Sequence, residues 1–227
     1  MPAVAQVVDF AVRLMRGLTW SRGLALATVL SLVWTISIFA APFTQPPGTV
    51  ALSVDGGANR IDNGDLYGGY NGYAQAVYFL SDIQCHQLPD RSLYVNGNQM
   101  PLDARMTSIY LFMNVGLLSA ALIAPASTLS QGILNVLPQR PRRWVRDHLR
   151  VDIGAFLVIL ATLLPVAVDG FTQLFGWRES TNELRVLTGV FTGWGTGLLL
   201  GAMFTSLKQF EREIRAVRAM SGVDQRF

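Results

Sequence analysis

Charged residues are scarce in this sequence, and lysine is nearly absent. Asp, Glu, Lys and Arg make up 15% of the 227 residues, against about 25% in a typical soluble domain, and Lys208 is the single lysine. Hydrophobic residues make up 51%, and the mean hydropathy is +0.34. This balance is typical of a membrane protein. The net charge of +3 comes with neither a basic face nor a nucleic-acid-binding signature, so nucleic acid is excluded as an expected partner.

Cysteine and histidine are also scarce. The single cysteine, Cys85, excludes an intramolecular disulfide, and it is followed directly by His86, one of two histidines. A catalytic cysteine and its base are brought together by the fold rather than by adjacency in the sequence. Nucleophile, metal ligand and ordinary packing residue therefore stay open as three interpretations of Cys85.

Four stretches almost free of charge are long enough to cross a membrane as helices. They lie at about 23–43, 107–126, 152–175 and 184–207. Crossing the hydrocarbon takes about 20 residues, and these stretches lack the polar face of helices in a soluble bundle. The sequence predicts an all-α, polytopic membrane protein with four transmembrane helices. Asp169 in the third span is expected to face other helices and to have a partner, because a carboxylate at that depth is costly.

Arginine is distributed unevenly among the segments outside the spans. Residues 1–22, 140–150 and 208–227 carry most of the 18 basic residues. The positive-inside rule then predicts a multi-pass protein of the cell membrane with both termini in the cytoplasm and the loop 44–105 on the extracytoplasmic side. Residues 1–22 are expected to form an interfacial helix along the cytoplasmic surface of the membrane, and residues 208–227 a basic cytoplasmic tail.

The loop 44–105 is long for a connector, which predicts structure of its own. Apolar residues at helical spacing from Leu66 to Leu80 predict one amphipathic helix, with Cys85 and His86 at its C-terminal end. The dipeptide Asn96-Gly97 is the strongest short signal for a β-hairpin.

Glycine recurs at every fourth position of the fourth span. The positions are Gly189, Gly193, Gly197 and Gly201. Small residues at this spacing lie on one helix face and let another helix approach closely. The approaching helix belongs either to the same chain or to a second copy in a homodimer.

The connection between the third and fourth spans, "DGFTQLFGWRESTNELR", is rich in polar residues. Ser180 and Glu183 fit a capping box, which predicts that the fourth helix begins at Ser180. A helix N-terminus flanked by Arg178 and Arg185 is a candidate anion site. The alternative is that these arginines pair internally with acidic residues such as Asp169.

This connection and the segment "CHQLPDRSLYVNGNQMPLDARMTSIY" resemble a domain-of-unknown-function family of small bacterial and archaeal integral membrane proteins. The family pattern has Cys-His, Arg-Ser, a Gly-Gln-Pro turn and Cys-Ala-Arg-Cys-Thr-Gly-Ile-Tyr; after the next span come Asp-Gly-x-Thr-Gln and Arg-Glu-Ser-Thr-Asn-x-x-Arg. The resemblance covers roughly half of the chain. The motif residues are Cys85, His86, Arg91, Ser92, Arg105, Thr107, Tyr110, Asp169, Thr172, Gln173, Arg178, Glu179, Ser180, Asn182 and Arg185.

The chain departs from the family pattern at Asp103 and Met106, where the family commonly has cysteines. A set of one histidine and three cysteines would suit zinc. Cys85, His86 and Asp103 remain as candidate metal ligands here, too few for a closed structural zinc site. We therefore predict no metal and no other cofactor.

Both motifs are expected on the same side of the membrane, where their arginines would line one polar pocket. Guanidinium groups bind phosphate and carboxylate through paired hydrogen bonds. The leading hypothesis is a pocket for an anionic lipid headgroup or a small anion, with His86 or Asp169 as a catalytic proton carrier. Its ligand-binding residues would be Arg91, Arg105, Tyr110, Gln173, Arg178, Asn182 and Arg185.

Two other hypotheses compete with the anion pocket. The chain could be a non-catalytic subunit or assembly factor of a larger membrane complex, in which the arginines form internal salt bridges and the glycine face docks a partner. The other is a small transporter, which with four spans would have to dimerise.

Overall fold

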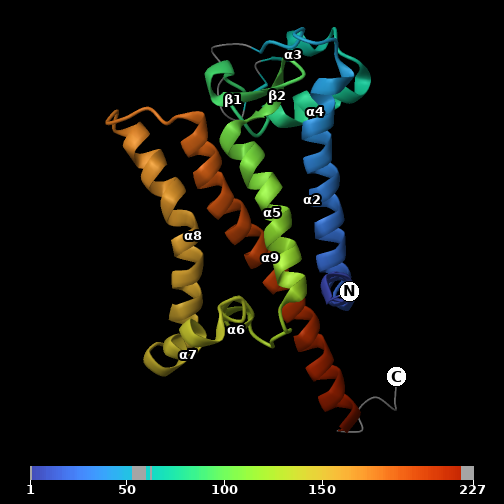
Figure 1. Ribbon diagram of the computed structural model, residues 1–227, viewed down its shortest axis with the longest axis vertical. Coiled ribbons are helices and arrows are strands. Elements are labelled where there is room, and N and C mark those ends of the chain that lie inside the picture. The colour runs from blue at the N-terminus through green and yellow to red at the C-terminus, as the bar shows by residue number, and fades with distance from the viewer. Residues whose placement is uncertain (1, 53–59, 62, 221–227) are drawn as a thin grey trace. The chain divides into compact units, whose positions relative to one another are not determined.

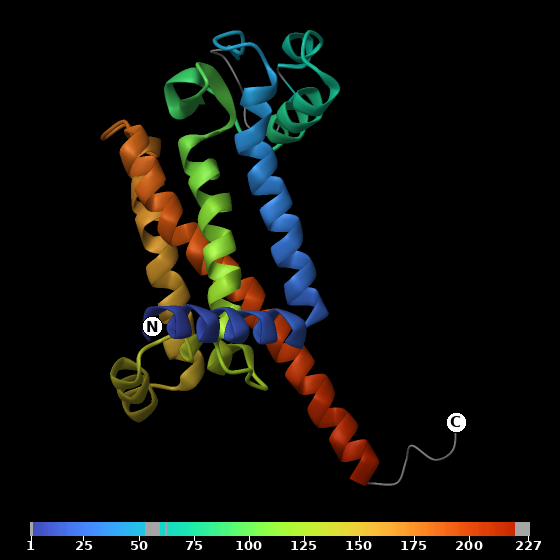
Figure 2. The same ribbon diagram turned by 45° about the vertical axis from the view of Figure 1, so that its right-hand side comes forward.

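The computed structural model describes residues 2–52, 60–61 and 63–220. The last residues of the expected tail, 221–227, lie outside this description. Most of the described residues are helical (Figures 1 and 2). The helices are α1 (Pro2–Trp20), α2 (Arg22–Ala40), α3 (Gly64–Tyr67), α4 (Gly72–Asp82), α5 (Ala104–Leu122), α6 (Leu129–Leu134), α7 (Gln139–His148), α8 (Val151–Leu174) and α9 (Asn182–Met220).

Four of these helices are long and apolar enough to cross a membrane. These candidate spans are Arg22–Thr44, Ala104–Leu122, Val151–Leu174 and Asn182–Met220. The first continues from α2 into a short 3-10 helix, η1 (Ala41–Thr44). The predicted class, a helical membrane protein with four spans, is confirmed.

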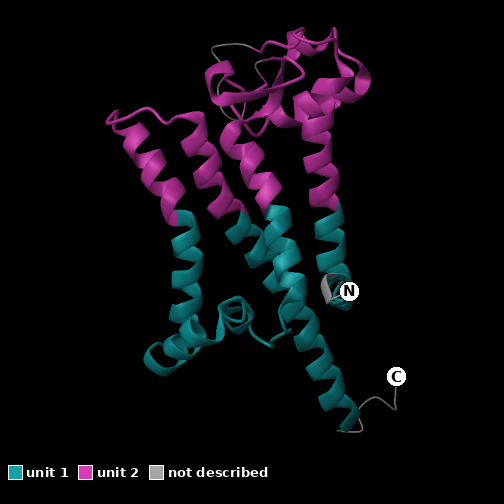
Figure 3. Cartoon of the chain, viewed as in Figure 1, with its two compact units in different colours: residues 1–29, 113–163, 194–227 teal, residues 30–112, 164–193 magenta. Residues whose placement is uncertain are grey.

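The chain divides into two compact units, and the boundary between them falls inside α2, α5, α8 and α9 (Figure 3). Unit 1 comprises residues 1–29, 113–163 and 194–227, and unit 2 comprises residues 30–112 and 164–193. Each unit has its own buried apolar clusters and is described by itself.

In unit 1, α1 lies crosswise to the beginning of α2 (Figure 2). Leu14 and Leu18 of α1 pack against a buried cluster of Leu24, Leu117 and Ala121. The close approach has a steric requirement, because a Cβ added at Gly17 would lie 1.6 Å from the carbonyl oxygen of Ala121. That α1 lies along a membrane surface stays a prediction.

In unit 2, the loop between the first two spans is folded, as the sequence predicts. Its hairpin consists of antiparallel strands β1 (Ser92–Val95) and β2 (Asn98–Asp103), in which Val95 faces Asn98. The turn residues Asn96 and Gly97 have φ values of 57° and 72°. These left-handed conformations match the right-handed twist of the flanking strands, which is why Asn-Gly favours this turn.

The prediction of one continuous helix from Leu66 to Leu80 is wrong. The structure has two helices there, α3 and α4, separated by residues 68–71. Asn71 begins the second helix, because its side-chain Oδ1 accepts a hydrogen bond from the backbone N–H of Ala74 (3.0 Å). The Gly68-Gly69 pair before it disfavours continuous helix. The apolar spacing missed both this local cap and most of the buried face, because Leu66, Tyr73 and Leu80 are exposed.

Buried amide side chains hold this loop together. The Oδ1 of Asn98 accepts from the backbone N–H of Thr49 (2.8 Å), and Gln99 donates from Nε2 to the carbonyl of Gln87 (2.7 Å). Gln87 in turn accepts at Oε1 from the hydroxyl of Tyr67 (3.0 Å). All three amides are inaccessible to solvent. Because buried polar groups are costly when unpaired, these bonds define one arrangement of the loop.

The glycines of α9 pack against α5 in both units. In unit 2, a Cβ added at Gly193 would lie 2.3 Å from the carbonyl oxygen of Ile109, and in unit 1 one added at Gly197 would lie 2.1 Å from that of Met113. Gly189 and Gly201 meet the same helix at Ser108 and Ala120. The face that could have formed a seam with a second copy is therefore occupied within the chain.

Candidate functional site

The site is organised by Asp169, a buried carboxylate near the C-terminal end of α8 in unit 2. Its side chain is 2% exposed. Oδ2 accepts from the hydroxyl of Ser180 (2.9 Å), from Nε2 of Gln173 (3.0 Å) and from Nη2 of Arg105 on α5. Oδ1 accepts from Nη2 of Arg178 (3.2 Å). Both oxygens of the carboxylate thus have charged partners, as a buried ion requires.

The chain returns to Asp169 because α8 ends in a Schellman motif. Gly176 has a φ of 68°, its N–H donates to the carbonyl of Gln173 (3.0 Å), and the N–H of Trp177 donates to that of Thr172 (3.0 Å). Glycine adopts this left-handed conformation without steric penalty. The reversal brings the next residues, Arg178 and Ser180, back over the last turn of the helix.

The prediction that Ser180 caps the fourth span is wrong. Helix α9 begins at Asn182, and the side chain of Thr181 accepts the capping hydrogen bond from the N–H of Leu184 (3.4 Å). The hydroxyl of Ser180 donates instead to Asp169. A charged acceptor gives a stronger hydrogen bond than a neutral one, which accounts for this choice.

Arg185, on the first turn of α9, is buried without a carboxylate partner. Only 6% of its surface is exposed, and its Nη1 donates to Oδ1 of Asn182 (2.9 Å). Among the described residues, no carboxylate oxygen lies within 4.0 Å of its guanidinium nitrogens. Arg91 and Arg105 lie near enough to repel its charge, and Asp103 and Asp90 attract it less strongly from a greater distance than an ion pair. Arg185 is therefore buried without a direct ion-pair partner among the described residues.

Asn182 connects the first turn of α9 to the segment Asp90–Ser92, which forms the other side of the site. Its Nδ2 donates to the carbonyls of Asp90 (3.2 Å) and Ser92 (3.4 Å), at a short 3-10 helix, η2 (Pro89–Arg91), that leads into β1. The same side chain accepts from Arg185, so one amide aligns Arg91 with Arg185.

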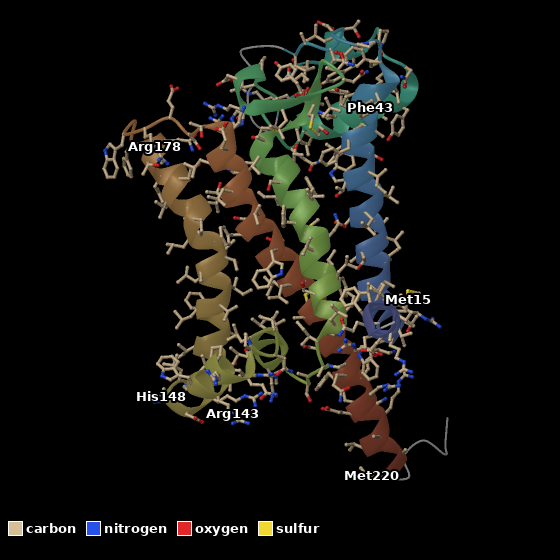
Figure 4. All side chains as sticks on the ribbon, in the orientation of Figure 1. Met15, Phe43, Arg143, His148, Arg178 and Met220 are labelled. Atoms are coloured by element: carbon tan, nitrogen blue, oxygen red, sulfur yellow. The ribbon has the colours of Figure 1, made fainter. Side chains whose placement is uncertain are left out.

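A cavity of about 240 Å³ lies between η2, the turn that joins α8 to α9, and the first turn of α9. We call it the arginine-lined cavity. Its lining combines three arginines with two exposed carboxylates and an amide: Asp90, Arg91, Gln173, Gly176, Arg178, Glu179 and Arg185. Figure 4 shows Arg178 in the turn that joins α8 to α9. Asp90 lies 3.8 Å from Nε of Arg91, a long and exposed ion pair.

The structure brings together most, but not all, of the residues that the sequence proposed for a ligand pocket. The cavity is lined by Arg91, Gln173, Arg178 and Arg185. Arg105, Asp169 and Asn182 do not line it, but Asp169 accepts hydrogen bonds from Arg105 and Arg178, and Asn182 accepts one from Arg185. His86 is half-buried and does not line it. Tyr110 packs edge-on against Trp34 and hydrogen-bonds Gln84, away from the cavity.

Cys85 is a packing residue rather than a reactive one. It is buried in an apolar cluster with Ile38, Met100 and Leu102. Burial and, to a lesser extent, the negative charge of Asp103 raise the pKa of the Cys85 thiol to about 12. Because the thiolate is the nucleophile and the metal ligand, this thiol suits neither role at neutral pH. No group of three or more His, Cys, Asp or Glu side chains among the described residues is arranged to hold a metal ion.

Sequence reasoning missed three cavity-lining residues, Asp90, Gly176 and Glu179, and misassigned Ser180. The signal at Gly176 was available, since a glycine just past an apolar helix is typical of a helix C-cap. The partner of Ser180 was not, because it depends on the reversal of the chain.

Fold and site together define a small polytopic membrane protein with a buried carboxylate–arginine network. The chain belongs to a family described as predicted membrane protein, DUF2085, whose sequence model matches residues 85–199. This range contains every residue that lines the arginine-lined cavity and the hydrogen-bonding residues Arg105, Asp169 and Asn182. It also contains the α9 glycines from Gly189 to Gly197.

Two archaeal relatives have no assigned activity. An uncharacterized protein of Methanocaldococcus jannaschii is 34% identical over 118 residues, which cover 52% of this chain and 62% of the relative. An uncharacterized protein of Methanothermobacter thermautotrophicus is 35% identical over 117 residues, covering 51% of this chain and 82% of the relative. No solved structure matches the chain significantly.

The buried network predicts a large effect of one substitution. Asp169→Asn leaves Arg105 partly buried without a counter-charge, and breaking a buried pair in this way costs about 3–5 kcal/mol. We expect a correspondingly lower free energy of unfolding in detergent. The control is Asp152→Asn, which removes an exposed carboxylate from the first turn of the same helix. Equal stability of the two variants would contradict the role given to Asp169.

Proposed function

We propose that the arginine-lined cavity between the α8–α9 turn and η2 binds a phosphate or carboxylate anion, free or as part of a lipid headgroup. The observation that carries the proposal is Arg185, which is buried and lacks a carboxylate partner. A buried charge is costly unless it is paired. An anion in the cavity would supply the partner that the described residues do not.

The neighbouring groups suit recognition of an anion. Arg91 and Arg178 face the same cavity as Arg185, and guanidinium groups bind phosphate or carboxylate with two parallel hydrogen bonds. Asp169 does not neutralise Arg185, because its oxygens already accept from Arg105 and Arg178. The two carboxylates of the lining are exposed, so water weakens their attraction to the arginines.

The cavity also limits the size of its ligand. Pockets for drug-sized molecules measure about 300–1,000 Å³, whereas this one measures about 240 Å³. It therefore accommodates a phosphate, a carboxylate or a compact headgroup rather than a large metabolite.

Binding is better supported than catalysis. Asp169 has no oxygen left without a donor, and His86 does not line the cavity. Their roles as proton carriers remain a prediction of the sequence, and the proposed function is confined to recognition of the anion.

A structural subunit or assembly factor is the second candidate function. The network of Asp169 with Arg105 and Arg178 is the internal salt bridge expected of such a scaffold. It does not include Arg185, which is why anion binding is preferred.

The distribution of arginine further supports a place in the cell membrane with both termini in the cytoplasm. In this orientation the hairpin β1–β2 and the cavity face the extracytoplasmic side.

A labelling experiment tests the orientation. Tyr94→Cys on the hairpin and Arg140→Cys in the first turn of α7 both place a thiol at an exposed position, while the native Cys85 stays buried. In intact cells, a membrane-impermeant maleimide should label the first variant alone, and after permeabilisation both. The reverse pattern in intact cells would contradict the proposed orientation.

Anion binding is tested with inorganic phosphate and the purified protein in detergent. Arg185→Gln removes a charge-assisted hydrogen bond worth about 1.5–3 kcal/mol, so phosphate affinity measured by calorimetry should fall by about 10- to 150-fold, at about 1.4 kcal/mol for each factor of ten. Arg60→Gln removes an exposed arginine of the same unit and serves as the control. If the wild type binds neither phosphate nor acetate, or if both variants bind alike, the proposal fails.

A further inference from the structure

A second cavity in unit 2 adjoins the arginine-lined one. It measures about 340 Å³ and lies along α8 and α9; its lining is mostly apolar, with Asp169, Arg178 and Thr188 as the polar members. Val168, Leu187 and Phe191 contribute exposed side chains to it. We call it the apolar groove.

The two cavities share a wall. Arg178 lines both, with its guanidinium bonded to Asp169, which also lines the groove. A ligand at this point would meet arginines on one side and apolar side chains on the other. This juxtaposition of a cationic pocket and an apolar groove matches a molecule with an anionic head and an acyl chain.

Exposed aromatic rings near this junction are of the kind enriched at the level of lipid headgroups. Phe171, Phe175 and Trp177 form a stack, with ring centroids 6.4 Å and 5.4 Å apart, at the end of α8. All three are exposed, and Phe175 and Trp177 are the sequence neighbours of Gly176, which lines the arginine-lined cavity. Aromatic side chains, tryptophan above all, are enriched where a membrane meets water.

We propose that this site binds one anionic phospholipid, with the phosphate in the arginine-lined cavity and an acyl chain in the apolar groove. The inference rests on the proposed anion binding and specifies its ligand. The groove belongs to α8 and α9, two of the candidate spans, so the surrounding solvent is hydrocarbon, and an acyl chain can fill it without first leaving the membrane.

Charge distinguishes this ligand from the other occupants of such a groove. A helix of a second copy would fill the groove but leave Arg185 without an anion, whereas a free anion would satisfy Arg185 and leave the groove empty. A phospholipid that carries a net negative charge on its phosphate satisfies both cavities at once.

The experiment compares two probes that share a phosphate monoester and differ in their acyl chains. Dioctanoyl phosphatidic acid and glycerol 3-phosphate are titrated against the full-length protein in detergent, and bound species are counted by native mass spectrometry. The wild type should bind the lipid at least about tenfold more tightly, the equivalent of about 1.4 kcal/mol. Arg185→Gln should weaken the binding of both probes.

A bulky substitution in the groove separates the two parts of the site. Val168→Trp should weaken binding of the lipid by about tenfold or more, because the indole ring would occupy the space of the acyl chain, and should leave glycerol 3-phosphate unaffected. Val33→Trp makes the same change at an exposed position on α2 and is the control.

The outcomes separate this inference from the function on which it rests. Equal affinity for the two probes, or lipid binding that Val168→Trp leaves unchanged, would overturn the phospholipid assignment while anion binding stands. Failure of the wild type to bind either probe would overturn both.

Discussion

The buried carboxylate of Asp169 is the constraint on which the rest of the site depends. An ionised group at this position is tolerated only with partners, and the partners come from three separate segments: Arg105 from α5, Gln173 from α8 itself, and Arg178 with Ser180 from the turn into α9. Satisfying one carboxylate thus fixes the start of one span against the end of another and determines the path of the turn between α8 and α9. The Schellman motif at Gly176 makes that path sterically accessible.

This arrangement leaves Arg185 without a direct ion-pair partner among the described residues. Asp169 is fully engaged, and Asn182 contributes a neutral oxygen to Arg185 while it holds η2 through the carbonyls of Asp90 and Ser92. A charge kept buried without a partner lowers stability, and such costs are concentrated at sites where function requires them. The cavity in front of Arg185 and the apolar groove beside it are the places where a ligand would recover that energy.

Features governed by length, polarity or a two-residue signal were predictable from the sequence. The four spans follow from uncharged stretches of sufficient length, and the hairpin from Asn96-Gly97. The need of Asp169 for a partner follows from the cost of burying a carboxylate. These predictions rest on properties of short segments, which do not depend on tertiary contacts.

Features that depend on competition between partners were not predictable. Ser180 fits a helix cap, but its hydroxyl donates to Asp169, and Thr181 becomes the cap. The helix expected from Leu66 to Leu80 is interrupted because Asn71 starts a new one. His86 and Arg91 are close in sequence, yet only Arg91 reaches the cavity, since their directions are determined by the fold of the loop.

The central claim is that Arg185 is kept for a ligand rather than for stability, and one comparison tests it most directly. The free energy of unfolding of Arg185→Gln and of the wild type would be measured in a buffer free of phosphate and carboxylate, and again with saturating phosphate. Without the anion, we predict a variant at least as stable as the wild type, because a buried charge that lacks a direct ion-pair partner has been removed. With the same concentration of phosphate, the wild type should gain more stability than the variant, because it binds the anion more tightly. A variant about 3–5 kcal/mol less stable without the anion, the usual cost of breaking a buried pair, would show that Arg185 is structural and contradict the account.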